Sequence, residues 1–303
     1  MKRNILVSLF IISLFSCVEN FDLKLRDAES KLVVEGLITN QAGSYYVRLT
    51  KSTPGGLSSN TNSRNHEDNA ESVKNAVVII ADDFNQIDTL TQFDFDISDP
   101  DYLWGPHNQG FYKTNQLIGI PGHTYTLTIK YDGKEYRASS FMAPVPKIDS
   151  LSYYLKKTEI VGKSDYYVPL LYFKEPQDID NYYLIQLSKD INSRIYSSSV
   201  LWQFSILSDD LLKPYVNGLN VSTGVTPREI NIYPVYSKGD SIYVALNSLS
   251  EEAFNYYKAL LDQFNSDGGY YNSTPATPPG NISNGGLGFF RASAVSENRT
   301  YIK

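Results

Sequence analysis

Residues 119–140 constrain the fold more strongly than any other stretch of this sequence. A Pro-Gly turn at residues 121–122 is followed by residues 125–129, in which Tyr, Leu and Ile alternate with Thr. This alternation places three apolar side chains on one face of a β-strand. Asp132 and Gly133 then supply a tight hairpin turn, because both central positions of such a turn adopt positive φ. The stretch therefore predicts an antiparallel hairpin with one buried face.

Tyr125 follows its turn in the manner of a tyrosine corner. In immunoglobulin-like sandwiches the hydroxyl of such a tyrosine bonds to the backbone of the preceding turn. About seven short strands, separated by turn residues, are expected before the proline-rich joint that follows residue 143. This spacing predicts an immunoglobulin-like β-sandwich over residues 31–143.

A second, β-rich domain is expected over residues 144–303. Its one helix is predicted at residues 249–264, where apolar residues recur at helical spacing and form a single stripe. Ser248 and Glu251 have the spacing of a capping box at the start of that helix. The predicted fold class is therefore mainly β, with an N-terminal immunoglobulin-like sandwich followed by a β-rich C-terminal domain that contains one amphipathic helix.

The N-terminus has the pattern of an export signal. Two basic residues precede an apolar run at residues 5–15, which is too short for a membrane-spanning helix of about 20 residues. The run ends in Leu-Phe-Ser-Cys at residues 14–17, which resembles the lipobox of bacterial lipoproteins. We expect a lipoprotein signal peptide over residues 1–16 and lipidation of Cys17. The alternative is a plain secretory signal that happens to contain a cysteine.

Cys17 is the only cysteine of the chain. Exported cysteines usually form disulfides, so lipidation explains a lone thiol better than a free side chain does. Residues 17–30 are polar and mixed in charge, which predicts a flexible tether behind the lipid. Glu19 and Asp22 resemble the surface-export signal of Bacteroidetes lipoproteins. We therefore expect a lipid-anchored protein of the outer membrane that is exposed at the cell surface.

The charge of the chain argues against nucleic acid as a partner. Lys and Arg number 27 against 33 Asp and Glu, which gives a net charge of −6. Removal of the two basic residues of the signal changes this to 25 − 33 = −8. Proteins that bind nucleic acid cluster Lys and Arg against the phosphates. With no basic run in the sequence, we expect no nucleic-acid partner.

Candidate metal ligands are few. Asp94, Asp96, Asp99 and Asp101 form the one oxygen-rich cluster of the sequence. They could hold Ca²⁺, which takes about six to eight oxygen ligands, and the alternative is the solvated face of a strand. No zinc site is expected, because the three histidines are scattered and the cysteine is lipidated.

The sequence contains no catalytic motif that we can identify. A Gly-x-Ser-x-Gly elbow and a phosphate-binding loop are missing, and the Gly-rich residues 285–288 precede no predicted helix. A catalytic serine would also need a positioned base. We therefore expect a protein that is not an enzyme and that carries no cofactor other than the Ca²⁺ considered above. The alternative is a hydrolase.

Aromatic residues in loops are the remaining candidates for ligand binding. Tyr102 and Trp104 share one loop, and Tyr270 and Tyr271 share another that is rich in Gly and Pro. Such side chains offer rigid, amphipathic contact area to a glycan or a peptide. The alternative is that they pack on the sheets, as most tyrosines of a sandwich do.

Six stretches follow one another along the chain after Cys17: LVVEGLIT at residues 32–39, NAVVI at 75–79, PGHTYTL at 121–127, IDSL at 148–151, the helix start at 250–257, and GNISNG ahead of GFF at 280–290. Their sequences and their order resemble a family of Bacteroidetes outer-membrane lipoproteins catalogued as a domain of unknown function, often encoded beside TonB-dependent (SusC-like) receptors. The resemblance implies an N-terminal sandwich, a β-rich C-terminal part and no established catalytic residues.

Three Asp-Ser/Thr-apolar triplets resemble the O-glycosylation sites of exported Bacteroidetes proteins, and their acceptors would be Thr89, Ser150 and Ser241. The function we expect is that of a non-catalytic, lipid-anchored accessory subunit of a TonB-dependent transport complex. Such a subunit would bind outer-membrane lipid through Cys17, a partner barrel, and a nutrient such as a glycan or peptide. The alternative is a structural or adhesive cell-surface protein.

Overall fold

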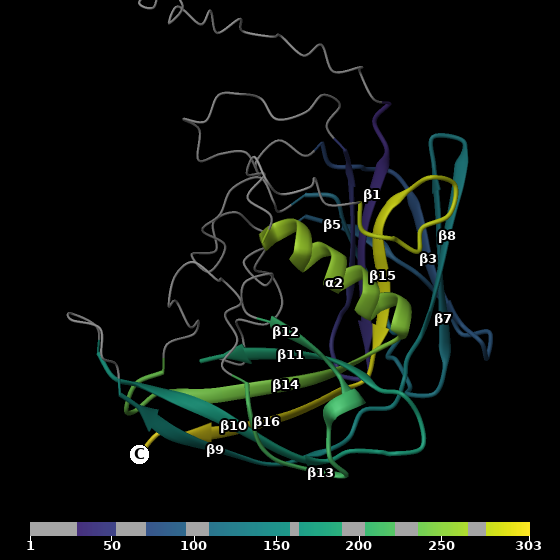
Figure 1. Cartoon of the computed structure of the whole chain (residues 1–303). Helices are drawn as coiled ribbons and strands as arrows, with labels where there is room; N and C mark the ends of the chain where they lie inside the picture. The colour runs from purple at the N-terminus through teal and green to yellow at the C-terminus, as the bar shows by residue number, and fades with distance from the viewer. Residues whose placement is uncertain are drawn as a thin grey trace, which may run out of the picture.

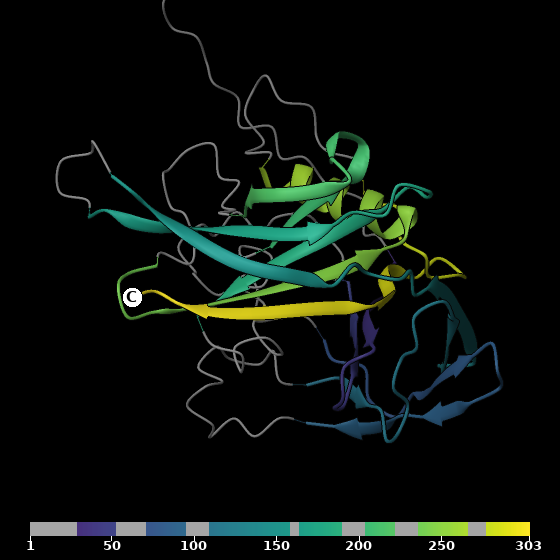
Figure 2. The same cartoon turned by 90° about the horizontal axis from the view of Figure 1, so that it is seen from below.

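The computed structural model describes residues 29–52, 71–94, 109–157, 164–189, 204–221, 236–265 and 277–303. Within these ranges the protein is mainly β, with one α-helix, α2 (Glu251–Asn265). The predicted β-rich fold with a single helix is therefore confirmed. Figure 1 and Figure 2 show two layered β regions whose strands run in different directions, with α2 in the corner between them.

The N-terminal sandwich consists of two sheets. Sheet A has the strand order β15 (Leu287–Ser293), β1 (Leu32–Thr39), β2 (Tyr46–Lys51), β6 (Phe111–Lys113) and β5 (Thr91–Phe93). Sheet B has the order β4 (Ile87–Thr89), β3 (Val77–Asp82), β7 (Thr124–Tyr131) and β8 (Lys134–Phe141). Neighbouring strands are antiparallel, except that β1 and β15 are parallel.

The hairpin predicted at residues 119–140 is present as β7 and β8. Its turn residues Asp132 and Gly133 adopt φ values of 50° and 69°, as a type I′ turn requires. The backbone N–H of Ile120 donates a hydrogen bond of 2.6 Å to the hydroxyl of Tyr125. This is the bond expected of a tyrosine corner, so that prediction is also confirmed.

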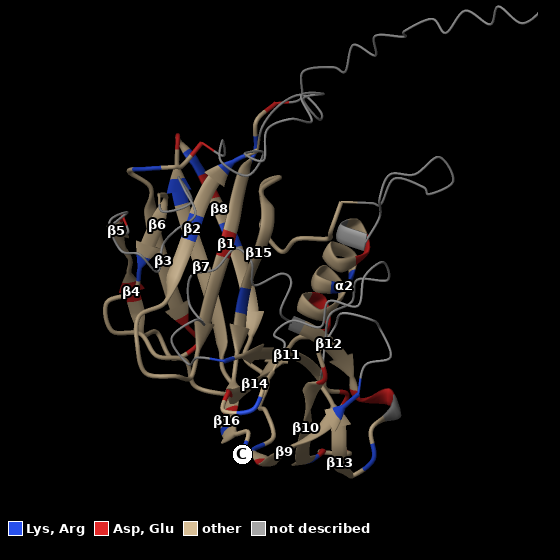
Figure 3. Ribbon diagram, turned by 90° about the vertical axis from the view of Figure 1, so that its left-hand side faces the viewer, with Lys and Arg blue, Asp and Glu red and all other residues tan. Residues whose placement is uncertain are grey.

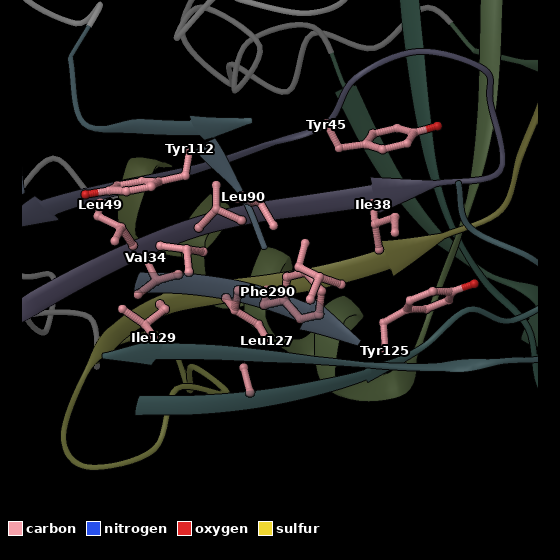
Figure 4. Packing of buried hydrophobic residues seen from close by; sticks show 14 of the residues in the cluster. Val34, Ile38, Tyr45, Leu49, Leu90, Tyr112, Tyr125, Leu127, Ile129 and Phe290 are labelled. Carbon is pink, nitrogen blue, oxygen red and sulfur yellow. The ribbon is translucent and has the colours of Figure 1, made fainter. Parts of the chain in front are cut away.

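The core of the N-terminal sandwich lies between sheets A and B. Figure 4 shows inward-pointing side chains from β1, β2, β7 and β15 meeting in one layer. In β7 the buried residues are Tyr125, Leu127 and Ile129, and the threonines between them are only half-buried. Full burial of one such aliphatic side chain is worth about 1.5–3 kcal/mol. The alternation read from the sequence is thus what places β7 in the sandwich.

The C-terminal half forms a second two-sheet arrangement. Sheet C has the order β13 (Tyr215–Asn220), β10 (Tyr166–Lys174) and β9 (Ile148–Lys156). Sheet D has the order β12 (Phe204–Ser208), β11 (Tyr182–Ser188), β14 (Ser241–Leu249) and β16 (Val295–Tyr301). Phe173 of sheet C and Tyr183 of sheet D share one buried cluster with the apolar residues of β14.

Strand β15 connects the two halves of the chain. After α2 the chain enters sheet A, where β15 pairs with β1, and then returns to sheet D as β16. The approach to β1 is close at Gly288, which adopts a φ of 90°, and a Cβ atom there would lie 2.0 Å from the carbonyl oxygen of Val34. The predicted C-terminal domain, residues 144–303, therefore supplies a strand to the N-terminal sandwich.

The segment before β15 docks on β8. The backbone N–H of Ser283 donates to the carbonyl of Arg137, and the N–H of Arg137 donates to the hydroxyl of Ser283, at 2.8 and 2.7 Å. The amide side chain of Asn281 bonds both backbone groups of Phe290, at 2.8 and 2.9 Å. These bonds explain how the GNISNG stretch guides β15 into sheet A.

Helix α2 begins after Ser250, whose hydroxyl accepts a hydrogen bond of 3.2 Å from the N–H of Ala253. The capping box predicted at Ser248 is wrong, because β14 extends past that residue. The hydroxyl of Ser248 instead donates to the carbonyl of Ala143 and accepts from the N–H of Ala294, at 2.6 and 2.9 Å. Ser248 therefore links β14 to Ala143 and Ala294, and Ser250 is the residue that caps the first turn of the helix.

Helix α2 forms a third layer against both halves. Ala253 is buried with Leu184 and Leu249 of sheet D and with Phe289 of sheet A. The helix thus covers one face of sheet D and the β15 edge of sheet A, as Figure 1 shows. Among the described residues, no helix combines the length and the hydropathy that a membrane crossing requires.

Candidate functional site

The outer face of sheet A, which points away from the sandwich core, carries a row of aromatic and charged residues. The strand register places them side by side: Glu35 is opposite Phe289 on one side and Arg48 on the other, and Arg48 is opposite Phe111, which is opposite Phe93. We call these five residues the outer row. Figure 3 shows the strands of sheet A side by side, with α2 next to β15. Partners in register share a face and contact each other.

Cations lie over the aromatic rings of this face. The guanidinium carbon of Arg48 lies 5.6 Å from the ring centre of Phe111, and the Nζ of Lys113 lies 5.3 Å from that of Phe93. Tyr46 contacts both phenylalanine rings, with centroid distances of 5.7 and 6.2 Å. Such cation–π contacts are worth about 0.5–2 kcal/mol each. They hold Arg48 and Lys113 in place without neutralising their charge.

A pocket of about 290 Å³ lies at the β5 end of the outer row. Its lining combines one aromatic ring, one ammonium group, three hydroxyls and two amides: Phe93, Lys113, Ser44, Thr91, Thr114, Gln92 and Asn115. The volume is at the lower limit of small-molecule sites, about 300 Å³. The pocket therefore suits a small polar ligand or one end of a larger one.

Asp88 fixes the wall of this pocket. One oxygen of its carboxylate accepts hydrogen bonds from the backbone N–H groups of Asn115, Gln116 and Leu117, at 2.9, 2.9 and 3.0 Å. Burial raises the pKa of Asp88, but these bonds outweigh it and hold the pKa below its usual value. The side chain of Asn115 also accepts from the hydroxyl of Thr91 at 3.1 Å. The pocket wall is thus preorganised.

Arg291 lies at the opposite end of sheet A, on β15. It is 6% exposed, and within the described part of the chain its Nε and Nη1 atoms have no hydrogen-bond partner. Its guanidinium carbon lies 5.3 Å from the ring centre of Tyr257 of α2. The Nε of Arg48 is likewise buried without an acceptor there, and its Nη1 lies 3.9 Å from the Oε2 of Glu35.

Tyr256 of α2 borders the same region. Its ring stacks on that of Phe289 with a centroid distance of 4.9 Å. Burial raises the pKa of Tyr256, and the nearby Tyr257 and Glu35 raise it further, so the hydroxyl stays protonated. The β15 end of the outer row therefore combines aromatic rings with an excess of positive charge.

Comparison with protein families gives one match. The family model described as domain of unknown function DUF4249 matches residues 18–299, nearly the whole chain. The chain belongs to the DUF4249 family. No curated protein matches the sequence. The resemblance to a family of unknown function is thus confirmed, and its Bacteroidetes and receptor context stays a prediction.

Most site residues predicted for this DUF4249 chain lie outside the described ranges: Cys17, Asp96, Asp99, Asp101, Tyr102, Trp104, Tyr270 and Tyr271. Of the acidic cluster only Asp94 is described, and its Oδ2 lies 3.8 Å from the Nζ of Lys74. Among the described residues, no three His, Cys, Asp or Glu side chains come together as a metal site would require. Calcium binding by the cluster stays a prediction.

The three predicted glycosylation sites of the DUF4249 chain all lie on strands. Thr89 on β4 and Ser150 on β9 are exposed. Ser241 at the start of β14 is half-buried, and its hydroxyl accepts a hydrogen bond of 2.7 Å from the Nε of Arg299. Modification of the first two needs no rearrangement, whereas modification of Ser241 would break that bond.

The residues that the structure brings together in this DUF4249 chain lie in no recognisable sequence motif. They are Glu35, Arg48, Lys113 and Arg291. One signal was available, because Arg291 is the only charged residue in the otherwise apolar and small run at residues 287–294. A lone charged residue in a buried strand is a signal, because burial of an unpaired charge lowers the stability of the fold.

Proposed function

We propose that this protein is a non-catalytic, lipid-anchored binding protein of the outer membrane and an accessory subunit of a TonB-dependent transport complex. Cys17 is its lipid anchor, and the outer face of sheet A is its binding surface for a partner barrel, a nutrient or both. The observation that carries the proposal is the outer row with the pocket at its β5 end.

The composition of the outer row supports a binding role. Outward-facing positions of a β-sandwich are normally polar, whereas this row contains Phe93 and Phe111 together with Arg48, and its third phenylalanine, Phe289, is buried under α2. Aromatic residues and arginine are the side chains that contribute most to binding energy at interfaces. The row thus has the residue types of an interface on a face that the sandwich core does not use.

The pocket supports a small-molecule component of that binding. Lys113 and the hydroxyls and amides around it provide hydrogen-bond donors and acceptors, and Phe93 provides a flat apolar wall. A few polar groups around an aromatic surface are typical of sites that orient a small ligand. Because Asp88 holds the backbone at residues 115–117, binding would not have to order this wall.

The position of sheet A in the chain supports contact with a membrane partner. Strand β1 begins at Leu32, and 32 − 17 = 15 residues separate it from Cys17. A fully extended chain of that length spans at most about 50 Å. Lipidation at Cys17 would therefore keep the outer row within reach of a barrel in the same membrane.

The proposal is tested by extracting the native protein in mild detergent and identifying the proteins that purify with it. We expect a TonB-dependent barrel to co-purify with the wild type. Lys113→Glu should reduce the recovered barrel several-fold, because it reverses the charge beside Phe93. Lys134→Glu is the matched control, because Lys134 is an exposed lysine at the β7–β8 turn of the other sheet. Recovery of the wild type without any barrel would rule out the accessory role.

The anchor and the membrane face have separate tests. Cys17→Ala should release the protein from the membrane fraction, and its retention there would show that lipid does not anchor it. Protease treatment of intact cells should digest the wild-type domain if it is on the cell surface. Complete protection, with digestion after lysis, would place the domain in the periplasm instead.

A further inference from the structure

Arg291 has hydrogen-bonding capacity that the described chain does not use. The side chain is 6% exposed, and in the described ranges neither Nε nor Nη1 has an acceptor. These two atoms carry three N–H donors, and a guanidinium does not lose its proton in proteins. Buried polar groups are nearly always hydrogen-bonded, and one that is not requires an explanation such as a bound ligand. Arg291 therefore marks a place where an acceptor is missing.

The surroundings of Arg291 are aromatic. The ring of Tyr257 lies against its guanidinium at 5.3 Å, and Phe289, two residues earlier on the same face of β15, stacks on Tyr256. A ring face attracts a cation but gives no conventional acceptor to an in-plane N–H group. The missing partner is thus an oxygen-bearing group, and it would lie beside the rings of Tyr257 and Phe289.

The charged residues on this part of sheet A indicate the charge of the group that would bind Arg291. Arg48 and Arg291 carry two positive charges, and Glu35, which lies on β1 between β2 and β15, carries one negative charge. The sum, 2 − 1 = +1, matches a single negative charge. A carboxylate would neutralise this sum, whereas a doubly charged phosphate would change it to 1 − 2 = −1.

We propose that the β15 end of sheet A binds the carboxylate group of an organic ligand, using a set of side chains that we call the Arg291 cluster: Glu35, Arg48, Tyr256, Tyr257, Phe289 and Arg291. Arg291 donates hydrogen bonds to the carboxylate oxygens, and the rings contact the organic part. The inference rests on the proposed binding role of this face and names its ligand class. It does not depend on the partner barrel.

The test uses the purified full-length protein in detergent, with benzoate as the probe and benzamide as its neutral analogue of the same shape. Calorimetric titration should show saturable benzoate binding and a dissociation constant for benzamide that is at least about tenfold higher, since hydrogen bonds to charged groups contribute about 1.5–3 kcal/mol each. Equal binding of both probes, or no benzoate binding, would overturn the proposal. Inorganic phosphate is titrated in parallel, and phosphate binding tighter than benzoate would overturn the carboxylate assignment.

Variants locate the binding. Arg291→Met keeps the apolar stem but removes all N–H donors, and it should abolish benzoate binding. Arg299→Met is the matched control, because Arg299 is an exposed arginine that also lies over a ring, that of Tyr301, at 4.6 Å. Wild-type affinity in Arg291→Met would overturn the proposal. If that variant does not fold, Arg291→Lys and the benzoate–benzamide comparison in the wild type still decide it, with about tenfold weaker benzoate binding expected for the lysine variant.

This test and the co-purification test fail independently. Loss of the barrel partner with benzoate binding intact would remove the transport role and leave the carboxylate site. Barrel co-purification without benzoate binding would leave the accessory role and remove the carboxylate site.

Discussion

Glu175 and Arg291 are buried to nearly the same extent, 1% and 6% exposed, but their surroundings differ. The carboxylate of Glu175, at the end of β10, lies 2.8 and 3.0 Å from the hydroxyl of Tyr183 and accepts from the Nδ2 of Asn181 at 3.0 Å. Arg291 has two nitrogen atoms without any acceptor in the described chain. The C-terminal half thus provides hydrogen-bond donors to its buried carboxylate, whereas the described part of the N-terminal sandwich provides no acceptor for two nitrogen atoms of its buried arginine.

The difference separates a structural charge from a functional one. A buried charge that its neighbours satisfy ties elements together, here β10 to β11 through Glu175 and Tyr183. A buried charge whose N–H donors lack acceptors lowers stability, so a fold that keeps one is expected to use it for binding. Removal of the Tyr183 hydroxyl that bonds Glu175 should therefore lower the free energy of unfolding, whereas removal of the Arg291 guanidinium should raise it.

The largest effect is expected from Gly288→Ala, which displaces the strand that carries Arg291. The added Cβ would lie 2.0 Å from the carbonyl oxygen of Val34, at a φ of 90°. Because the close contact is with a backbone atom, it can be relieved only by displacing β1 or β15. We therefore expect a loss of about 4 kcal/mol or more in the free energy of unfolding. Urea denaturation followed by circular dichroism measures it.

Gly133→Ala is the control for backbone strain alone. Gly133 has a φ of 69°, and a Cβ there would meet nothing within 4 Å. It should lose only about 1 kcal/mol. Equal losses in the two variants would mean that the β1–β15 contact does not determine the effect, and Arg291 would then not depend on that contact for its position.

Tyr183→Phe should have the next largest effect, because among the described residues it leaves Glu175 buried with Asn181 as its remaining side-chain donor. We expect a loss of about 1.5–3 kcal/mol at pH 7, the range for a hydrogen bond to a charged group. Tyr236→Phe is the matched control, because the hydroxyl of Tyr236 donates to a neutral acceptor, the carbonyl of Ser188, at 3.1 Å. It should lose about 1 kcal/mol. A loss in Tyr183→Phe no greater than that would show that Glu175 does not rely on the tyrosine.

Local elements of this fold could be predicted because their signals are local. The alternation in residues 125–129 and the turn at Asp132 and Gly133 specify β7 and β8 without reference to the rest of the chain. The start of α2 was predicted two residues early, because Ser248 and Ser250 both resemble capping residues in sequence. Only the bonds of Ser248 to Ala143 and Ala294 distinguish them, and those partners are remote in sequence.

The candidate site could not be predicted for the same reason. Residues 33–39 pair with residues 287–293, and no local pattern encodes a parallel pairing over such a separation. Without it, nothing places Arg291 near Glu35 and Arg48. Whether a buried arginine has partners is also a property of packing and not of sequence. The charge in the apolar run at residues 287–294 was the one visible sign.

Arg291→Met should change stability in the direction opposite to Tyr183→Phe. In the absence of ligand it removes a buried charge without acceptors and keeps an apolar stem, so the free energy of unfolding should rise by about 1–2 kcal/mol. Arg299→Met, at an exposed site, should stay within about 0.5 kcal/mol of the wild type. The measurement is urea denaturation of ligand-free protein. A clear loss of stability in Arg291→Met would mean that the fold itself satisfies this side chain, and the contrast with Glu175 would disappear.

The smallest effect is in the pH dependence of stability. Burial raises the pKa of Glu175 above its ordinary value of 4.5, and the charge of Asp209 adds to this, so the folded protein binds that proton more tightly than the unfolded chain does. The resulting stability is fully present below about pH 4.5 and is lost as the pH rises through the folded-state pKa. Asp88 acts in the opposite sense, because its pKa is lowered from 3.8, and its contribution is lost only as the pH falls through that lower value.

Glu175→Gln isolates this contribution, because the amide cannot titrate. As the pH falls from 7 toward 4.5, the wild-type Tm should rise relative to that of Glu175→Gln, because the raised pKa of Glu175 makes the folded protein bind the proton more tightly. Asp178→Asn, which removes an exposed acid from the turn that follows β10, should keep the wild-type slope. Thermal unfolding followed by circular dichroism across this pH range gives the three slopes. Parallel curves for wild type and Glu175→Gln would show that Tyr183 and Asn181 fully offset the burial of the carboxylate, which would make Glu175 an even stronger contrast to Arg291.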